Sequence, residues 1–180
     1  IQISGYNEDV DTTWEPIWSD GTLTLPTVAT IVKVSSGSAS DTANGTGAQT
    51  VFISGLDANY NSISETVALA GQTAVNTVNS YFRINGFVVV SVGTGGTAAG
   101  TIYAGTGIVA SGIPATVFDQ IPVGWNSRQT TAYTVPAGHT AYICYSRLTF
   151  AQNSGTSPVW GRILMVGTNN VPTATVSAVA

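Results

Sequence analysis

The stretch "SISETVALAGQTAVNTV", residues 62–78, decides the fold class. Its first half has two sets of alternating positions. One set is mostly apolar, Ile63, Glu65, Val67 and Leu69, and the other is small or polar, Ser62, Ser64, Thr66 and Ala68. Because successive side chains of a strand point to opposite faces, this pattern predicts a strand with one packed face and one neutral face exposed to water. Gly71 can adopt a positive φ, so we expect the chain to turn there into a second strand.

Similar short apolar runs, separated by Gly, Asn, Ser and Pro, recur along the whole chain, and helical periodicity is scarce. We expect strands at 27–34, 48–54, 62–69, 73–78, 81–93, 99–105, 116–121, 129–135, 139–151 and 157–167. The tail, 169–180, is compatible with a last strand or with an arm on a neighbouring subunit. So many strands predict an all-β protein, an antiparallel β-sandwich or jelly-roll.

The domain organisation follows from length and composition. The 180 residues suit one domain, and we expect an N-terminal arm over 1–25 followed by a β-sandwich domain over 26–180. Two small β lobes meeting near 105–115 are the alternative. The Ser- and Gly-rich segments 35–49 and 93–100 are predicted to be flexible connections.

Charge is unusually scarce in this chain. Only 8% of residues are charged, against about 25% in an ordinary soluble domain, whereas the chain has 26 Thr, 17 Ser and 20 Gly. The five basic residues are scattered singly and the net charge is -4, so no basic patch is expected for nucleic acid. No apolar run approaches the roughly 20 residues that span a bilayer. We therefore expect neither nucleic acid nor a membrane among the partners.

Residues suited to nucleophilic catalysis or to zinc binding are almost absent. His139 is the single histidine and Cys144 the single cysteine. Five residues apart on a regular strand, they would lie on opposite faces, which excludes a catalytic dyad. We expect a turn histidine and a core cysteine, and one residue of each kind cannot make an ordinary zinc site.

The acidic stretch "NEDVDTTWEPIWSDG", residues 7–21, holds five of the nine carboxylates. Asp9 and Asp11 fit the first positions of an EF-hand calcium loop and Asp20 fits the twelfth, but Trp14 occupies the position that needs glycine. Paired carboxylates for acid–base chemistry need burial in a cleft, and nothing in the sequence indicates burial here. We therefore expect no metal, no cofactor and no enzymatic activity.

The tryptophans of the same stretch suggest a different role. Trp14, Ile17 and Trp18 lie on one side if the segment is a helical turn, whereas only the two tryptophans share a face if it is extended. Large apolar anchors within a polar rim are typical of protein interfaces. Our candidate partner-binding residues are therefore Trp14, Ile17 and Trp18 with the flanking acids Asp9 and Asp11, and packing into the protein's own core is the alternative.

Several phrases resemble a known class of proteins: "GYNEDVDTTWEPIWSDG", "DTANGTGAQTVFISGLDANYNSISETVALAGQTAV", "YFRINGFVVVSVGTGGTAAGTI" and "YTVPAGHTAYI". Over roughly residues 5–150 the chain resembles structural proteins carried on the heads of tailed bacteriophages, most of all capsid decoration (cement) proteins. The resemblance implies a β-sandwich or jelly-roll and a homo-oligomer, with a trimer favoured. It also implies a place on the outer surface of the capsid in the virion, where the protein clamps neighbouring subunits of the major capsid protein. It carries over no catalytic residue.

A second hypothesis is a head-fibre or tail-tip component that binds host surface glycans. Aromatic rings stack on sugars and amides hydrogen-bond to them. The candidate residues are Trp125, Asn126, Tyr133, Tyr142 and Trp160.

Overall fold

The structure is a computed structural model that describes residues 2–7, 13–18, 22–147, 149, 160–166 and 172–179. These residues form strands and no helix, which confirms the all-β prediction, and none of them forms a helix long and apolar enough to cross a membrane. The chain divides into two compact units, Ile1–Thr140 and Ala141–Ala180.

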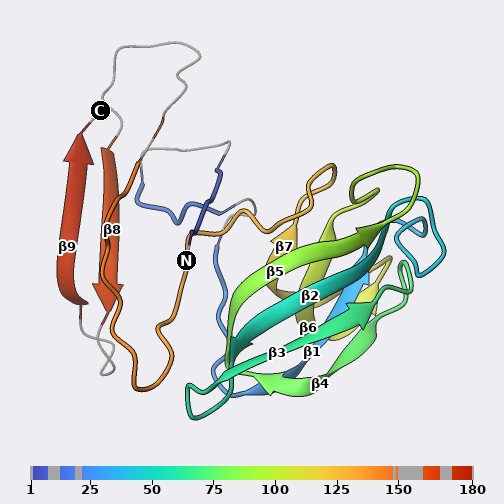
Figure 1. The fold of residues 1–180 in the computed structure, drawn as a ribbon, viewed down its shortest axis with the longest axis horizontal. Helices are drawn as coiled ribbons and strands as arrows, with labels where there is room; N and C mark the ends of the chain where they lie inside the picture. The colour runs from blue at the N-terminus through green and yellow to red at the C-terminus, as the bar shows by residue number, and fades with distance from the viewer. Residues whose placement is uncertain are drawn as a thin grey trace. The chain divides into compact units, whose positions relative to one another are not determined.

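The first unit is an antiparallel β-sandwich of two sheets (Figure 1). One sheet has the order β4-β1-β6-β7, and its strands are β1 (Thr30–Ser36), β4 (Val75–Tyr81), β6 (Ile102–Ala110) and β7 (Ile113–Ile121). The other has the order β3-β2-β5, with β2 (Ala48–Leu56), β3 (Ser62–Ala68) and β5 (Arg83–Val92). Of the two predicted architectures, the sandwich is therefore the one observed.

The core lies between the two sheets and consists of the side chains that point inward from each strand. It includes Val32 and Val34 of β1, Val51 and Ile53 of β2, Val67 of β3, Tyr81 of β4, Phe87 of β5, Ile102 of β6 and Phe118 of β7. Ile63 packs partly against this core while Ser62, Ser64 and Thr66 are exposed, as the alternation in the sequence predicted. Burial of the apolar side chains at alternate positions thus determines which face of each strand points inward.

Two predicted strands are absent from the described residues. Segment 129–135 and the described residues of 139–151, which are 139–147 and 149, have no strand structure. In segment 129–135, side chains form hydrogen bonds with backbone N–H and C=O groups that would otherwise pair with an adjacent strand. Asn85 binds both the N–H and the C=O of Thr134, and the Arg128 guanidinium donates to the carbonyl of Ala132. Such side-chain bonds replace a sheet ladder and leave the segment irregular.

The β6–β7 hairpin is continuous with the sandwich and bends back over it. Residues 105–115, where the sequence allowed a lobe boundary, lie within this hairpin, and the chain divides instead after Thr140. Lys33 donates to the carbonyl of Gly107 at 2.7 Å, and the Ser35 hydroxyl donates to that of Gly112 at 2.9 Å. The hairpin therefore covers part of the outer face of β1.

The turn at Gly71 has the predicted positive φ, +63°. It joins β3 to β4, which lie in different sheets, so it is a crossover between layers and not a simple hairpin. Glu65 of β3 fastens this crossover, because its carboxylate accepts hydrogen bonds from the backbone N–H groups of Val78 and Asn79 at 2.8 and 2.9 Å. Burial of the Tyr81 hydroxyl raises its pKa, and the nearby Glu65 carboxylate raises that pKa further.

In the second unit the strands β8 (Trp160–Val166) and β9 (Pro172–Val179) pair antiparallel. β8 was predicted, and β9 decides the open question about the tail in favour of a last strand. The segment 141–147 that begins this unit is exposed at every residue.

Candidate functional site

The described residues of the N-terminal stretch, 2–7 and 13–18, have no regular secondary structure and pack against the segment that follows β7. The N–H of Tyr6 donates to the carbonyl of Gln129, and both the N–H and the hydroxyl of Thr131 donate to the carbonyl of Ile17 at 3.2 Å. A Cβ added to Gly5 would meet side chains of Thr131 and Ile17, so the chains approach closely there. The stretch is therefore held on the sandwich at two points.

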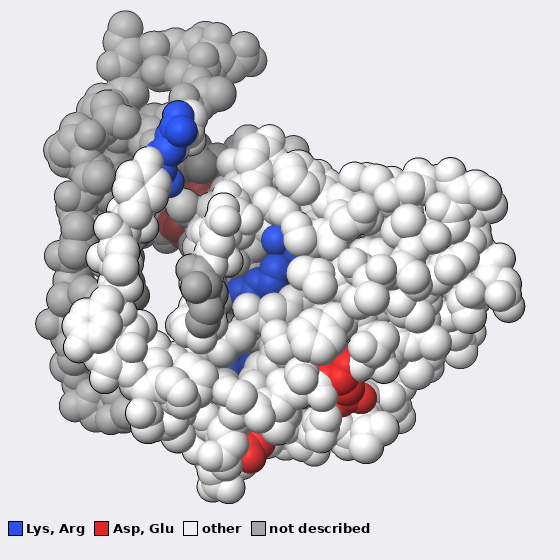
Figure 2. All heavy atoms as spheres, viewed as in Figure 1, with Lys and Arg blue, Asp and Glu red and all other residues white. Residues whose placement is uncertain are grey.

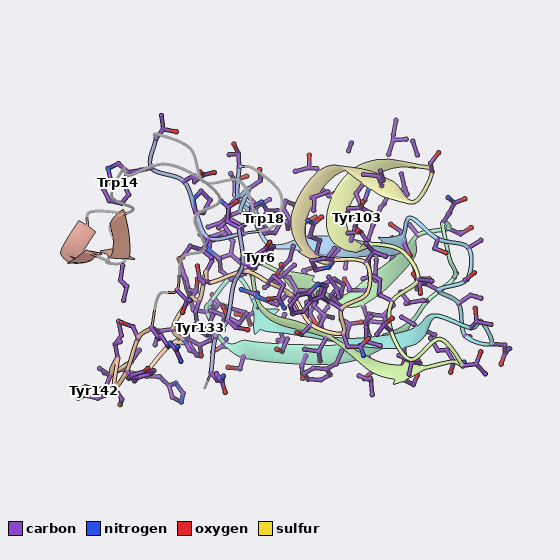
Figure 3. The ribbon with its side chains drawn as sticks, turned by 90° about the horizontal axis from the view of Figure 1, so that it is seen from above. Tyr6, Trp14, Trp18, Tyr103, Tyr133 and Tyr142 are labelled. Atoms are coloured by element: carbon purple, nitrogen blue, oxygen red, sulfur yellow. The ribbon has the colours of Figure 1, made fainter. Side chains whose placement is uncertain are left out.

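The two tryptophans of this stretch occupy different environments. Trp18 is 1% exposed and belongs to the protein's own core, whereas Trp14 is 56% exposed. In Figure 3, Trp18 and Tyr6 lie beside the strands of the first unit and Trp14 stands away from them. Neither the helical turn nor the shared extended face predicted for the pair is present. Self-packing thus accounts for Trp18, and Trp14 remains as the candidate anchor.

Asp9, Asp11 and Asp20 lie outside the described residues, so the structure gives no geometry for the calcium loop or for an acidic pair there. In the part of the chain that is described, no cluster of three or more His, Cys, Asp or Glu residues has the proximity needed to hold a metal ion.

Within the described part of the chain, the side chains of His139 and Cys144 contact backbone carbonyls two residues away. The Nδ1 atom of His139 lies 2.9 Å from the carbonyl oxygen of Ala137, in the turn that Pro136 begins, and the Cys144 thiol approaches the carbonyl of Tyr142 at 3.7 Å. The turn histidine is as predicted. The core cysteine was wrong, because Cys144 is exposed in the irregular segment 141–147. These local contacts give neither side chain the oriented partner that nucleophilic catalysis needs.

Arg128 and Asp119 form a buried ion pair. Arg128 Nη1 lies 2.6 Å from Asp119 Oδ2, and both side chains are buried. Asp119 also accepts hydrogen bonds from the Thr130 hydroxyl and the Gln120 N–H, and Arg128 donates to the carbonyls of Ile84, Thr130 and Ala132. Burial raises the pKa of Asp119, and the guanidinium opposes that rise. Since the pair is fully hydrogen-bonded and enclosed, its role is to hold the segment 127–134 on the sandwich.

A second buried carboxylate orders the glycine-rich loops. Asp41 accepts four hydrogen bonds, from the Ser36 hydroxyl and from the backbone N–H groups of Ala48, Ala99 and Gly100, at 2.6 to 2.9 Å. It therefore joins the loops within 35–49 and 93–100. The sequence predicted these loops to be flexible connections, but in the structure the carboxylate ties them together.

A shallow groove of 320 Å³ lies on the outer face of the β3-β2-β5 sheet. Its lining residues are Phe52, Ser54, Gly55, Ser62, Ile63, Ser64, Asn85, Tyr133 and Pro136. The strands supply its floor and the segment 133–136 supplies one wall. None of these lining residues is charged, and the groove presents aromatic rings beside serine hydroxyls.

No protein-family model, curated protein or solved structure matches this chain. The chemistry of the candidate sites is therefore inferred from the residues of this chain alone.

The residues proposed for glycan binding are dispersed in the structure. Tyr133 lines the groove, whereas Trp125 and Asn126 lie at the turn after β7, where Asn126 bonds with Val89 and Gly96. Tyr142 is exposed in the second unit and Trp160 begins β8. The sequence missed Phe52, Ser62 and Ser64, although the alternation that places both serines on the outer face of β3 was visible in it.

The surface carries few charges. On the face drawn in Figure 2, charged atoms appear only as separate spots within a mostly uncharged surface. Valines of β5 add apolar area to it, since Val88, Val90 and Val92 are exposed. Contacts made by this surface would depend on shape and apolar area more than on charge.

Proposed function

We propose that this chain is a virion structural protein of the decoration type, which binds the outer surface of a phage head and clamps neighbouring subunits of the major capsid protein. The observation that carries the proposal is the contrast between the two N-terminal tryptophans. Trp18 is buried and anchors the stretch on the sandwich, and Trp14 is presented to the exterior. A fixed stretch with an exposed tryptophan is suited to docking, because an anchored segment has less conformational entropy to lose on binding.

The rest of the molecule supports the same role. A β-sandwich with an uncharged, Ser- and Thr-rich surface suits a part that packs against other proteins, and the chain resembles decoration proteins in the phrases quoted above. Binding to the assembled lattice, and not to free subunits, stabilises the lattice by mass action, by about 2.7 kcal/mol per site when the protein is a hundredfold above its dissociation constant. We propose a homo-oligomer, with a trimer favoured, as the attached form.

The test uses heads of the encoding phage from which the protein has been stripped. We expect the added wild-type chain to attach and to raise the temperature at which the genome is released. Trp14→Ala should weaken attachment by roughly tenfold or more, as loss of a central interface anchor does. Trp125→Ala is the matched control, because Trp125 is an exposed tryptophan of the same unit, 49% exposed. Attachment and release temperature unchanged by Trp14→Ala would contradict Trp14 as the anchor, and no attachment of the wild-type chain would contradict the function.

A further inference from the structure

The groove on the β3-β2-β5 sheet is not used by the decoration role, and its chemistry points to a ligand. Phe52 of β2 and Tyr133 of the overlying segment contribute aromatic rings, and Ser54, Ser62 and Ser64 contribute hydroxyls. None of these three hydroxyls, nor that of Tyr133, forms a hydrogen bond with another residue that the structure describes. They are therefore available to a ligand that brings its own donors and acceptors.

The wall of the groove is held in place by buried and partly buried contacts. The Asn85 side-chain amide donates to the carbonyl of Thr134 at 2.7 Å and accepts from its N–H at 2.9 Å. Arg128 donates to the carbonyl of Ala132, and the N–H of Ala137 donates to the carbonyl of Tyr60 at 2.8 Å. Tyr133 thus sits between fixed backbone positions, so binding would not have to order the segment first.

The position of the groove on a sheet face disfavours two kinds of ligand. The central strand of the floor, β2, pairs with β3 on one side and with β5 on the other, so it offers no free backbone edge to an added peptide strand. The lining contains no Lys, Arg or His that would attract a phosphate or a carboxylate. Recognition would therefore come from the aromatic faces, from the apolar side chains of Ile63 and Pro136, and from the hydroxyl groups.

Neutral carbohydrates match this combination. A sugar ring has an apolar face that packs on an aromatic side chain, and its hydroxyls exchange hydrogen bonds with serine and tyrosine. The volume of 320 Å³ lies at the lower end of the range for small-ligand sites, about 300–1,000 Å³. We propose that the groove binds a neutral carbohydrate, with a sugar ring against Tyr133 and hydrogen bonds from its hydroxyls to Ser62 and Ser64. This inference does not depend on the decoration role.

The proposal is tested by NMR titration of the full chain with neutral trisaccharides of glucose, of galactose and of N-acetylglucosamine. We expect at least one of them to shift the backbone amides of Phe52, Ser64 and Tyr133, with saturation. No shift at these amides with any of the three sugars would overturn the proposal. Shifts at the same amides caused only by raising the protein concentration would also overturn it, because the occupant would then be a second copy of the chain.

Two pairs of variants identify the contacts. Tyr133→Ala should weaken binding of the active sugar by about fivefold or more, the effect expected for loss of one aromatic contact, and Tyr142→Ala, which removes an exposed tyrosine outside the groove, should not. Ser64→Ala, a small change at an exposed residue, should also weaken binding, whereas Thr66→Ala on the same face should not. Equal affinity in the wild type, Tyr133→Ala and Ser64→Ala would place the sugar elsewhere and overturn the assignment.

Discussion

Arg128 shows how a single residue determines the path of a segment that carries no regular structure. Its guanidinium pairs with Asp119 and binds carbonyls on either side of its own position, so the chain after β7 is fixed without a ladder of hydrogen bonds. In the sequence it is one of five scattered basic residues, nine positions from its partner. No local pattern predicts such a pair. Without knowledge of it, segment 129–135 was predicted to be a strand.

We expect Arg128→Met to lower the free energy of unfolding by about 3–5 kcal/mol, because it leaves the buried Asp119 carboxylate without its partner. Urea unfolding of both proteins measures this difference. Arg147→Met, at an exposed arginine, is the control and should change stability by less than about 0.5 kcal/mol. A loss below about 1 kcal/mol for Arg128→Met would show that the ion pair does not hold the segment.

Asp57 gives a prediction about pH. Its carboxylate accepts hydrogen bonds from the N–H of Asn61, the side-chain amide of Asn61 and the N–H of Asn59, and these bonds lower its pKa from the usual 3.8. Since folding favours the ionised form, the stabilisation of the 57–61 turn is present above about pH 4 and is lost as the pH falls through the lowered pKa.

The amide resonances of Asn59 and Asn61 should therefore titrate together in an NMR pH series, with a midpoint below 3.8. In Asp57→Asn the two resonances should show no such midpoint. A midpoint at or above 3.8 in the wild type would mean that the turn does not bind the carboxylate.

At the scale of elements, the sequence predicts strands well and connections poorly. Each of β1 to β8 overlaps a predicted strand, although the ends differ by several residues in β6 and β7, because alternation of apolar and small residues is a local signal. Contacts between distant residues determine the rest of the fold. They set the order of the strands in each sheet, the bend of the β6–β7 hairpin and the joining of two loops by Asp41. The groove was missed for the same reason, since its wall comes from segment 133–136 and its floor from β2 and β3.

The tip of the β6–β7 hairpin provides a matched test of this packing. Gly112 and Gly124 have nearly equal positive φ values, +82° and +78°, so alanine meets a similar backbone strain of about 1–2 kcal/mol at either position. An added Cβ at Gly112 would press against the carbonyl oxygen of Ser36, whereas at Gly124 it would meet nothing within 4 Å. We expect Gly112→Ala to cost a further 1–3 kcal/mol or so, as overpacking does. Equal unfolding free energies for the two variants would mean that the tip does not rest on β1.

At the scale of the whole molecule, the first unit contains both sheets of the sandwich and the core between them. We expect a chain ending at Thr140 to fold cooperatively, because seven strands and a closed core exceed what an independent β-structure needs, whereas the β8–β9 pair alone is below that size. Circular dichroism and a single sharp urea transition for residues 1–140 measure this. An unfolded or aggregated fragment would show that residues 141–180 are needed for the sandwich.

The uncharged surface is also a property of the whole molecule, and it was predictable from composition alone because only 8% of the residues are charged. Which part of that surface meets a partner was not predictable. Of the five residues proposed from the sequence, the structure leaves Trp14 exposed and places Trp18 in the core. Burial is decided by the whole fold, and two tryptophans four residues apart give no sign of which one will be enclosed.

We propose that this protein decorates a phage head, and a density map of the intact particle would show whether it does. We expect the sandwich of residues 30–121 to fit density on the outer surface of the head, repeated at symmetry-related positions between major capsid subunits, with Trp14 at the contact. Density for the chain only at a unique vertex or on the tail, or its absence from the particle, would contradict the account.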